Sequence, residues 1–139
     1  LSLLHTFKNK WLRSRTFARY QLSSETIRIP QLLARQEIAF LINHKAIHAE
    51  AGLLGTYVSN FFANAYDPSI RDYYLQNKNN VGGLILVDFF AALRVGSAKL
   101  YFKVDHSNAG FRGNNYELIP FHPLTDLTIK LGIKWTFWN

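Results

Sequence analysis

The residues that could perform chemistry are few and scattered. His44 and His48 lie four positions apart and Glu50 follows, a spacing that on a helix would present two imidazoles to a metal ion. On a strand, turn and strand, His44 lies in the turn while His48 and Glu50 point to one side, so the three do not converge. Asp105-His106 has no serine placed as a nucleophile. The sequence predicts no metal, no cofactor and no catalytic residue, and we expect a protein that is not an enzyme.

Charge and composition narrow the class of protein further. The 139 residues include 16 Lys+Arg and 9 Asp+Glu, a net charge of +7, which favours nucleic acid, an anionic membrane surface or anionic solutes as partners. The absence of cysteine excludes disulfides and cysteine-ligated metals. The best apolar run, Leu84 to Val95, is interrupted by Asp88 and is far shorter than the ~18 residues of a spanning helix.

Most of the chain alternates apolar and polar residues, which predicts half-buried strands. The clearest case is the C-terminal strand, whose apolar face holds Ile129, Leu131, Ile133, Trp135 and Phe137. We predict about seven strands, which span approximately 2–7, 12–20, 35–43, 48–57, 85–95, 98–105 and 129–137. Gly96-Ser97 predicts a tight hairpin turn between two of them.

Charged residues fall on a single parity within the six clearest strands. The face that carries them holds Arg13, Arg15, Arg19, Arg35, Glu37, His48, Glu50, Asp88, Arg94, Lys99, Lys103, Asp105, Lys130 and Lys134. Setting the histidine aside, nine of these are positive and four negative. Two interpretations remain open. The side chains line water and pair across strands, or they form a basic wall that favours anionic solutes.

The connections alternate between short turns and long loops. Long connections are predicted at 22–33, 59–83 and 106–127. The pattern therefore predicts an up-and-down meander with short turns at one rim and long loops at the other. Two segments carry helical signals. The composition of 31–52 favours helix, although we expect strands there because β preference yields to packing context. In the second loop Asp67 and Pro68 are the N-cap and first residue of an expected short helix.

A charge-free face is typical of a transmembrane β-barrel, in which this face meets lipid and the polar face lines the lumen. An Arg or Lys at the bilayer midplane costs about 2–4 kcal/mol, which explains why one face excludes charge. We therefore predict an all-β, antiparallel, up-and-down barrel with the charged residues above lining the lumen, the C-terminal apolar residues facing lipid, and the long loops extracellular. Because such barrels close with an even number of strands from eight upward, residues 1–139 are expected to be the C-terminal portion of one barrel domain.

Three stretches carry a resemblance to a known family: NAYDPSIRDYYLQNK, VDFFAALRVGSAKLYFKVDH and FHPLTDLTIKLGIKWTFWN, together with RIPQLLARQEIAF upstream. They resemble the C-terminal half of the putative porins of Bacteroidota-type outer membranes. The most specific parts are the loop with Tyr66, Asp67, Pro68, Tyr73 and Tyr74, the strand around Asp88, and the closing 135–139. The resemblance implies an outer-membrane β-barrel.

Three functions follow as hypotheses. The first is a bacterial outer-membrane channel for passive diffusion of small hydrophilic solutes, anionic ones among them. Its expected partners are outer-membrane lipid, the barrel-insertion machinery and the remaining barrel strands from the same or another chain, but not nucleic acid. The second is an occluded structural or docking barrel in an envelope complex for secretion or uptake. The third is a soluble basic β-domain that binds nucleic acid. The loop tyrosines and the segment 120–123 either fold inward over the pore or bind a partner.

Overall fold

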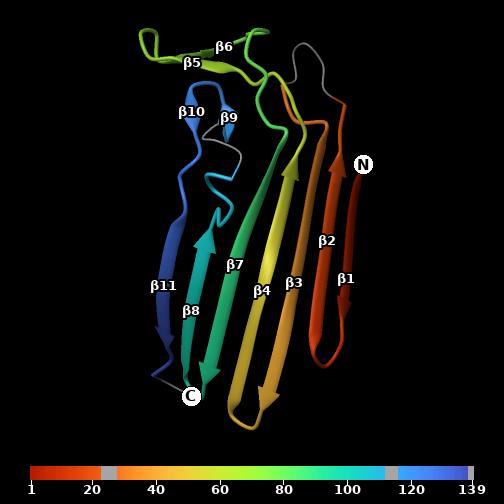
Figure 1. Cartoon of the computed structure of the whole chain (residues 1–139), viewed down its shortest axis with the longest axis vertical. Coiled ribbons are helices and arrows are strands. Elements are labelled where there is room, and N and C mark those ends of the chain that lie inside the picture. The colour runs from red at the N-terminus through yellow and green to blue at the C-terminus, as the bar shows by residue number, and fades with distance from the viewer. Residues whose placement is uncertain (23–27, 112–115, 138–139) are drawn as a thin grey trace.

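The computed structural model describes residues 1–22, 28–111 and 116–137, and these residues form an all-β structure. Seven strands make one antiparallel sheet, in the order β1-β2-β3-β4-β7-β8-β11 (Figure 1). The bounds of these strands are β1 Ser2–Lys8, β2 Leu12–Tyr20, β3 Leu32–His44, β4 Ile47–Val58, β7 Leu84–Val95, β8 Ala98–Asp105 and β11 Thr128–Trp135. The predicted strand number and the up-and-down meander are confirmed. Residues 138–139, the end of the C-terminal motif, lie outside the described residues.

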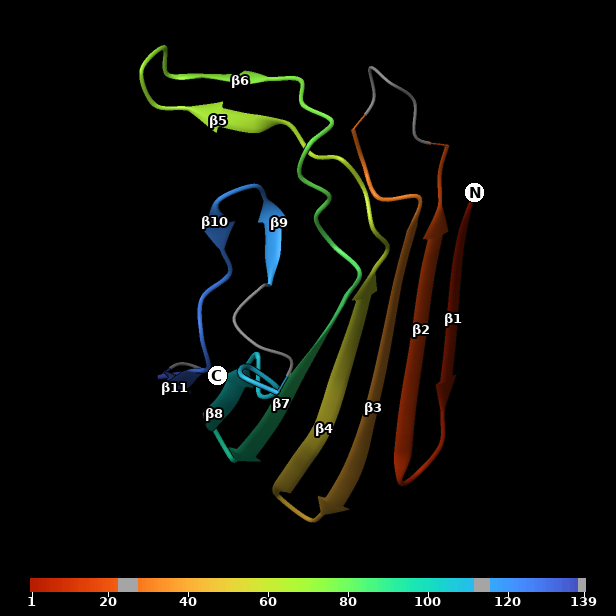
Figure 2. The ribbon, with the colours of Figure 1, turned by 45° about the horizontal axis from the view of Figure 1, so that its top comes forward.

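The sheet is open in the described part of the chain, with β1 and β11 at its two edges. It curves across its width between these edges (Figure 2). The short turns lie at one end of the sheet and the long connections at the other, which we name the short-turn end and the long-loop end (Figure 1). The two rims of the meander therefore differ, as the connection lengths predicted.

Local composition does not decide the conformation of residues 31–52. This helix-favouring segment forms β3 and β4, which pair over their whole lengths from Leu33 opposite Val58 to His44 opposite Ile47. Each strand has a second paired neighbour as well, β2 beside β3 and β7 beside β4. Packing between two neighbours therefore outweighs intrinsic helix propensity, as the sequence led us to expect. The expectation that His44 lies in the turn is wrong, because it is the last residue of β3.

The helix predicted to start at Asp67 is also wrong. The segment forms a hairpin of β5 (Ala65–Asp67) and β6 (Asp72–Tyr74), in which Asp67 pairs with Asp72. Asp67 Oδ1 does accept a hydrogen bond from the Ser69 N–H at 2.8 Å, so the side chain caps a turn and not the predicted helix. The chain then reverses at Arg71, which has a positive φ of 55°, instead of continuing as helix.

A second small hairpin lies in the third long connection. It consists of β9 (Glu117–Ile119) and β10 (His122–Pro123). Both hairpins lie at the long-loop end, with β5 and β6 beyond β9 and β10 (Figures 1 and 2). In the residues that the structure describes, no helix has the length and apolar character needed to cross a membrane.

Candidate functional site

Strand register places every predicted charged residue on the same face of the sheet, which we name the charged face. Directly opposed residues share a face, and Arg15 lies opposite Glu37 while Phe90 and Lys130 both lie opposite Lys103. His48 belongs to this face too, because it lies opposite Arg94. The segregation inferred from parity in single strands therefore holds across the sheet. Its assignment to a channel lumen stays a prediction.

The opposite, apolar face contains no Asp, Glu, Lys or Arg in the strands of the sheet. Its large side chains are open to the surroundings: Leu131 is 80% exposed and Ile133 is 74% exposed. On the charged face, by contrast, the Arg13 side chain is only 17% exposed. A water-soluble sheet buries the apolar side chains of one face, whereas this sheet leaves large ones exposed.

The predicted lipid-facing residues of the C-terminal strand lie on the apolar face up to Trp135. Ile129, Leu131 and Ile133 lie opposite Val104, Phe102 and Leu100 of β8. Phe137 lies two residues beyond the end of β11, and its ring stacks on Trp135 with centroids 6.1 Å apart and an interplanar angle of 12°. The aromatic pair therefore ends the strand at the short-turn end.

Three polar side chains on the apolar face, Ser14, Thr16 and Gln36, bond to one another. Gln36 accepts a hydrogen bond from Thr16 Oγ1 at its Oε1 (2.6 Å) and donates one from Nε2 to Ser14 Oγ (2.9 Å). Each of the three side chains thereby has a partner within the sheet. Mutual pairing removes the cost of presenting unbonded polar atoms to an apolar medium.

One ion-pair network crosses β2, β3 and β4 on the charged face, with Arg13 at its centre. Arg13 Nη2 lies 3.0 Å from Glu37 Oε1, and Arg13 Nη1 lies 2.9 Å from Glu50 Oε2, two strands away. The residue opposite Arg13 on the intervening strand is Ala39, which is fully buried. A small side chain there leaves room for the guanidinium to reach both carboxylates.

A second network crosses β7, β8 and β11. Lys103 and Lys130 are directly opposed, and both contact the carboxylate of Asp105. Lys103 Nζ also lies 3.4 Å from Asp88 Oδ2. The two carboxylates offset the repulsion that opposed lysines would otherwise feel.

The four predicted acids are thus all engaged with cations, whereas the predicted cations outnumber them. Within the described ranges, the predicted charged-face cations that form no ion pair with a carboxylate are Arg19, Arg35, Arg94, Lys99 and Lys134. The middle of the charged face is therefore electrically compensated. The surplus positive charge lies toward its two ends.

At the long-loop end the third long connection folds over the charged face. Tyr116 packs with Val58 and Leu84 in a buried cluster that Leu118 and Leu124 extend, and all three central residues are less than 10% exposed. His106, itself buried, places its ring edge-on to Tyr116 with centroids 4.4 Å apart. This connection therefore covers part of the charged face.

Asn108 attaches the same connection to the end of β7 that extends beyond β8. The Val87 N–H donates to Asn108 Oδ1 at 2.9 Å, and Asn108 Nδ2 donates to the Ile85 carbonyl oxygen at 2.7 Å. Ser107 N–H donates to the Val87 carbonyl oxygen at 2.7 Å. Asn108 and Ser107 thus bond the backbone of β7 where β8 does not extend beside it, so these backbone groups keep hydrogen-bond partners.

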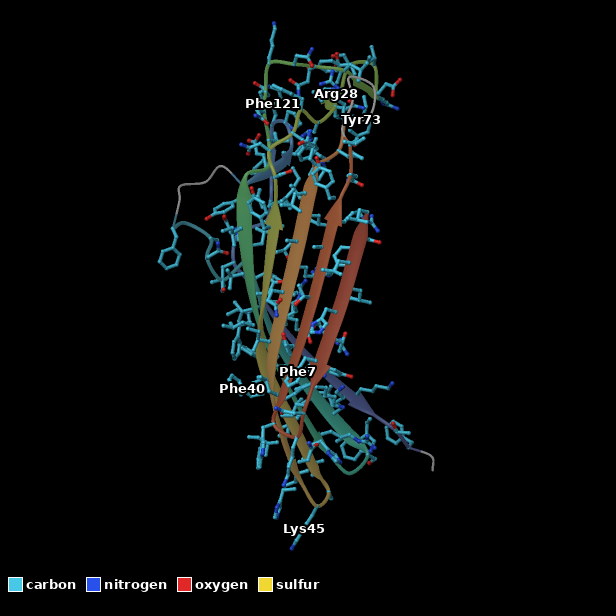
Figure 3. The ribbon with its side chains drawn as sticks, turned by 90° about the vertical axis from the view of Figure 1, so that its right-hand side faces the viewer. Phe7, Arg28, Phe40, Lys45, Tyr73 and Phe121 are labelled. Carbon is cyan, nitrogen blue, oxygen red and sulfur yellow. The ribbon has the colours of Figure 1, made fainter. Side chains whose placement is uncertain are left out.

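Two of the three loop tyrosines named from sequence, Tyr66 and Tyr73, contact each other through their rings. Tyr66 of β5 lies 5.2 Å from Tyr73 of β6 and 6.3 Å from His122 of β10, between ring centroids. The second and third long connections therefore touch through these aromatic rings. Tyr74 is 45% exposed, and Pro120 of the segment 120–123 is fully buried. Tyr73 and Phe121 lie at the opposite end of the molecule from Lys45 of the β3–β4 turn (Figure 3).

The structure does not bring the candidate metal ligands together. His44 pairs with Ile47 on the apolar face, whereas His48 and Glu50 lie on the charged face. His48 Nδ1 is 2.7 Å from Asn43 Oδ1, and Glu50 binds Arg13. No group of three metal-ligating side chains occurs among the residues described.

Sequence reasoning missed Tyr116 and Asn108, which hold the third connection on the sheet. Neither residue belongs to an alternating segment, and the distances that make them important span different strands and loops. Their residue types, a tyrosine and an asparagine in a loop, are common in any connection. Only the partners that the fold supplies distinguish them.

These features define a class: an antiparallel β-meander with an exposed apolar face and a charged, partly covered opposite face, as in a segment of a membrane β-barrel. A family model described as "Putative porin" matches residues 1–139. The chain therefore belongs to the putative porin family. A search of curated proteins and a search of solved structures both found no match.

Proposed function

We propose that this protein is part of an outer-membrane β-barrel channel through which small hydrophilic solutes, anionic ones among them, diffuse passively. The observation that carries the proposal is the segregation of charge to one face across seven strands, with large apolar side chains exposed on the other. Lipid would cover the apolar face and water would fill the space over the charged face. Membership of the putative porin family supports the same assignment.

The proposed role needs no enzyme activity, metal or cofactor. The partners are outer-membrane lipid on the apolar face, the barrel-insertion machinery during biogenesis, and further strands along the free edges of β1 and β11 from the same or another chain. Those strands are needed because unpaired backbone groups at a sheet edge are not tolerated in hydrocarbon. Nucleic acid is not among the proposed partners, because lipid and not solvent would surround the protein.

One observation favours a second candidate function, an occluded docking barrel in an envelope complex. The third long connection covers the charged face at the long-loop end and buries Tyr116 there. A plugged lumen would make the loops with Tyr66 and Tyr73 a surface for a partner rather than the mouth of a pore. Conductance separates the two candidates.

The orientation of the two faces can be tested by cysteine labelling, because the chain contains no cysteine of its own. Lys130 and Leu131 are consecutive in β11 and lie on opposite faces, so K130C and L131C form a matched pair. In full-length protein inserted into lipid vesicles, a membrane-impermeant maleimide should label K130C at least tenfold faster than L131C. Equal rates, or faster labelling of L131C, would contradict the proposed orientation.

Channel activity is tested by inserting the full-length protein into planar lipid bilayers. Stepwise conductance increases support the diffusion channel. A protein that shows the labelling pattern above without any conductance would favour the docking barrel, and a stoichiometric partner should then co-purify with it.

A further inference from the structure

The short-turn end of the charged face holds three cations in one cross-strand row. Arg94 of β7 lies opposite Lys99 of β8, which lies opposite Lys134 of β11. On the other side, Arg94 lies opposite His48. Directly opposed residues have Cβ atoms about 5 Å apart, so three positive charges on adjacent strands repel one another.

The chain itself provides a comparison for this row. Lys103 and Lys130 form another opposed pair on the same two strands, β8 and β11, and Asp105 and Asp88 supply their negative charge. Among the described residues, the row at the short-turn end has no such carboxylate. Glu50 lines the neighbouring hollow, yet its Oε2 binds Arg13 at 2.9 Å. The sheet therefore compensates one set of opposed cations and leaves the other without counter-charge.

The row borders an open hollow of about 620 Å³ that can hold a small solute. Ser97 and Thr136 line this hollow beside Arg94, Lys99 and Lys134 and supply hydroxyl donors. Lys99 Nζ lies 4.9 Å from the centroid of the Tyr101 ring, and Arg94 Nε is 3.5 Å from the Gly96 carbonyl oxygen, so neither cation is held by a strong anionic partner within the sheet. A planar guanidinium and two ammonium groups around one hollow match the donor pattern of an oxyanion.

We propose that Arg94, Lys99 and Lys134 form a binding site for dissolved oxyanions of the phosphate and carboxylate type at the short-turn rim of the charged face. The bound anion supplies the negative charge that Asp105 supplies to Lys103 and Lys130. The proposal deepens the channel function proposed above and rests on it for the identity of the solutes. It places their point of contact at one rim, away from the covered long-loop end.

Equilibrium binding tests the site without requiring conduction. Full-length protein folded in neutral detergent is titrated with inorganic phosphate at constant ionic strength, and binding is followed by calorimetry. The wild type should bind saturably, and the variant carrying R94Q, K99Q and K134Q should bind at least tenfold more weakly. K45Q removes one charge from the turn at the same end, and R35Q removes one from the charged face toward the other end; both should stay within twofold of the wild type.

Several outcomes would overturn the site. These are no saturable phosphate binding by the wild type, undiminished binding by the triple variant, or equal losses in K45Q and R35Q. A second arm uses vesicles with and without anionic lipid; if that lipid abolishes phosphate binding, the occupant is a headgroup and the assignment to a dissolved solute is wrong. If the protein binds phosphate but does not conduct, the proposed site stands and the proposed channel function is wrong. If it conducts but does not bind phosphate, only the proposed site is wrong.

Discussion

The two ends of the charged face differ in how far they are covered, although they belong to one sheet. At the long-loop end, Val58 and Leu84 turn toward Tyr116 and become buried beneath the third long connection. At the short-turn end, Arg94, Lys99 and Lys134 face an open hollow. Between them, two ion-pair networks neutralise the four acids. One face of a sheet can therefore combine a closed end and an open, cationic end.

The difference follows from the lengths of the connections. A two-residue turn such as Gly96-Ser97 has no residues with which to cover its rim, so the side chains there stay open to solvent. The connection between β8 and β11 has enough residues to fold back, and it brings its own apolar side chains. The cover at one end and the open row of cations at the other are thus consequences of topology. Four substitutions test this comparison, from the largest expected effect to the smallest.

Tyr116→Ala should open the closed end. Removing a large buried aromatic side chain costs about 3–5 kcal/mol, and this variant also loses the hydrogen bond from the Tyr116 hydroxyl to the Asn108 carbonyl oxygen (3.1 Å). We expect the third connection to detach, with faster proteolysis between 106 and 127 and a larger channel conductance. Tyr101→Ala is the control, because Tyr101 is 39% exposed on the same face. Equal protease sensitivity in both variants would argue against a packed cover.

Gly52→Ala should disturb the middle of the face, where the backbone of β3 lies close to Gly52 of β4. A Cβ atom at this position would overlap the Ile38 carbonyl oxygen and lie 2.8 Å from Ala39 Cα. Both are backbone atoms, so relief requires a shift of β3 and we expect a loss of about 1–3 kcal/mol in urea unfolding. Gly132→Ala is a matched control in β11, because its Cβ would meet only Tyr101 at 3.7 Å. Equal losses would contradict the close approach.

Asp105→Asn should remove the main counter-charge of the opposed pair Lys103 and Lys130, so that the pair becomes similar to the row of cations at the short-turn end. Lys103 and Lys130 would keep their opposed positions and lose the carboxylate that both contact. We expect a loss of about 1 kcal/mol that shrinks as salt is raised, because salt screens the exposed charges. Asp126→Asn, a charge change at an exposed position just before β11, should have no comparable effect. A loss that is independent of salt would point to packing and not to charge.

Lys99→Gln should have the smallest effect and the opposite sign. It removes the central charge of the row at the short-turn end, so repulsion falls and the unfolding free energy should rise by up to about 0.5 kcal/mol in chloride alone. The measurement is the unfolding free energy of the wild type and the variant at constant ionic strength, with and without phosphate. Phosphate should stabilise the wild type more than the variant, since a ligand of the folded state raises its stability. A variant that is destabilised in chloride would mean that the row is already compensated.

The sequence by itself determined the strands and the segregation of charge. Both depend on the period of two, which is local: a charge at 13, 15 or 19 points to one side of its strand whatever the strand pairs with. The strand number followed from the same pattern and the Gly96-Ser97 turn from its residue types, and both are confirmed. Where the local signal came from a cap instead, at Asp67, the expected helix was wrong because the same side-chain cap also fits a hairpin turn.

The tertiary structure alone decided which charges meet. Register is a relation between two strands, so the contact of Arg13 with Glu50 across β3, and the row of Arg94, Lys99 and Lys134, could not be read from parity. The cover over the long-loop end is equally non-local, because Tyr116 finds Val58 at a distance of 58 positions in the chain. Parity specifies the face that a side chain occupies, and pairing and loop folding specify its neighbours, because only they bring distant parts of the chain together.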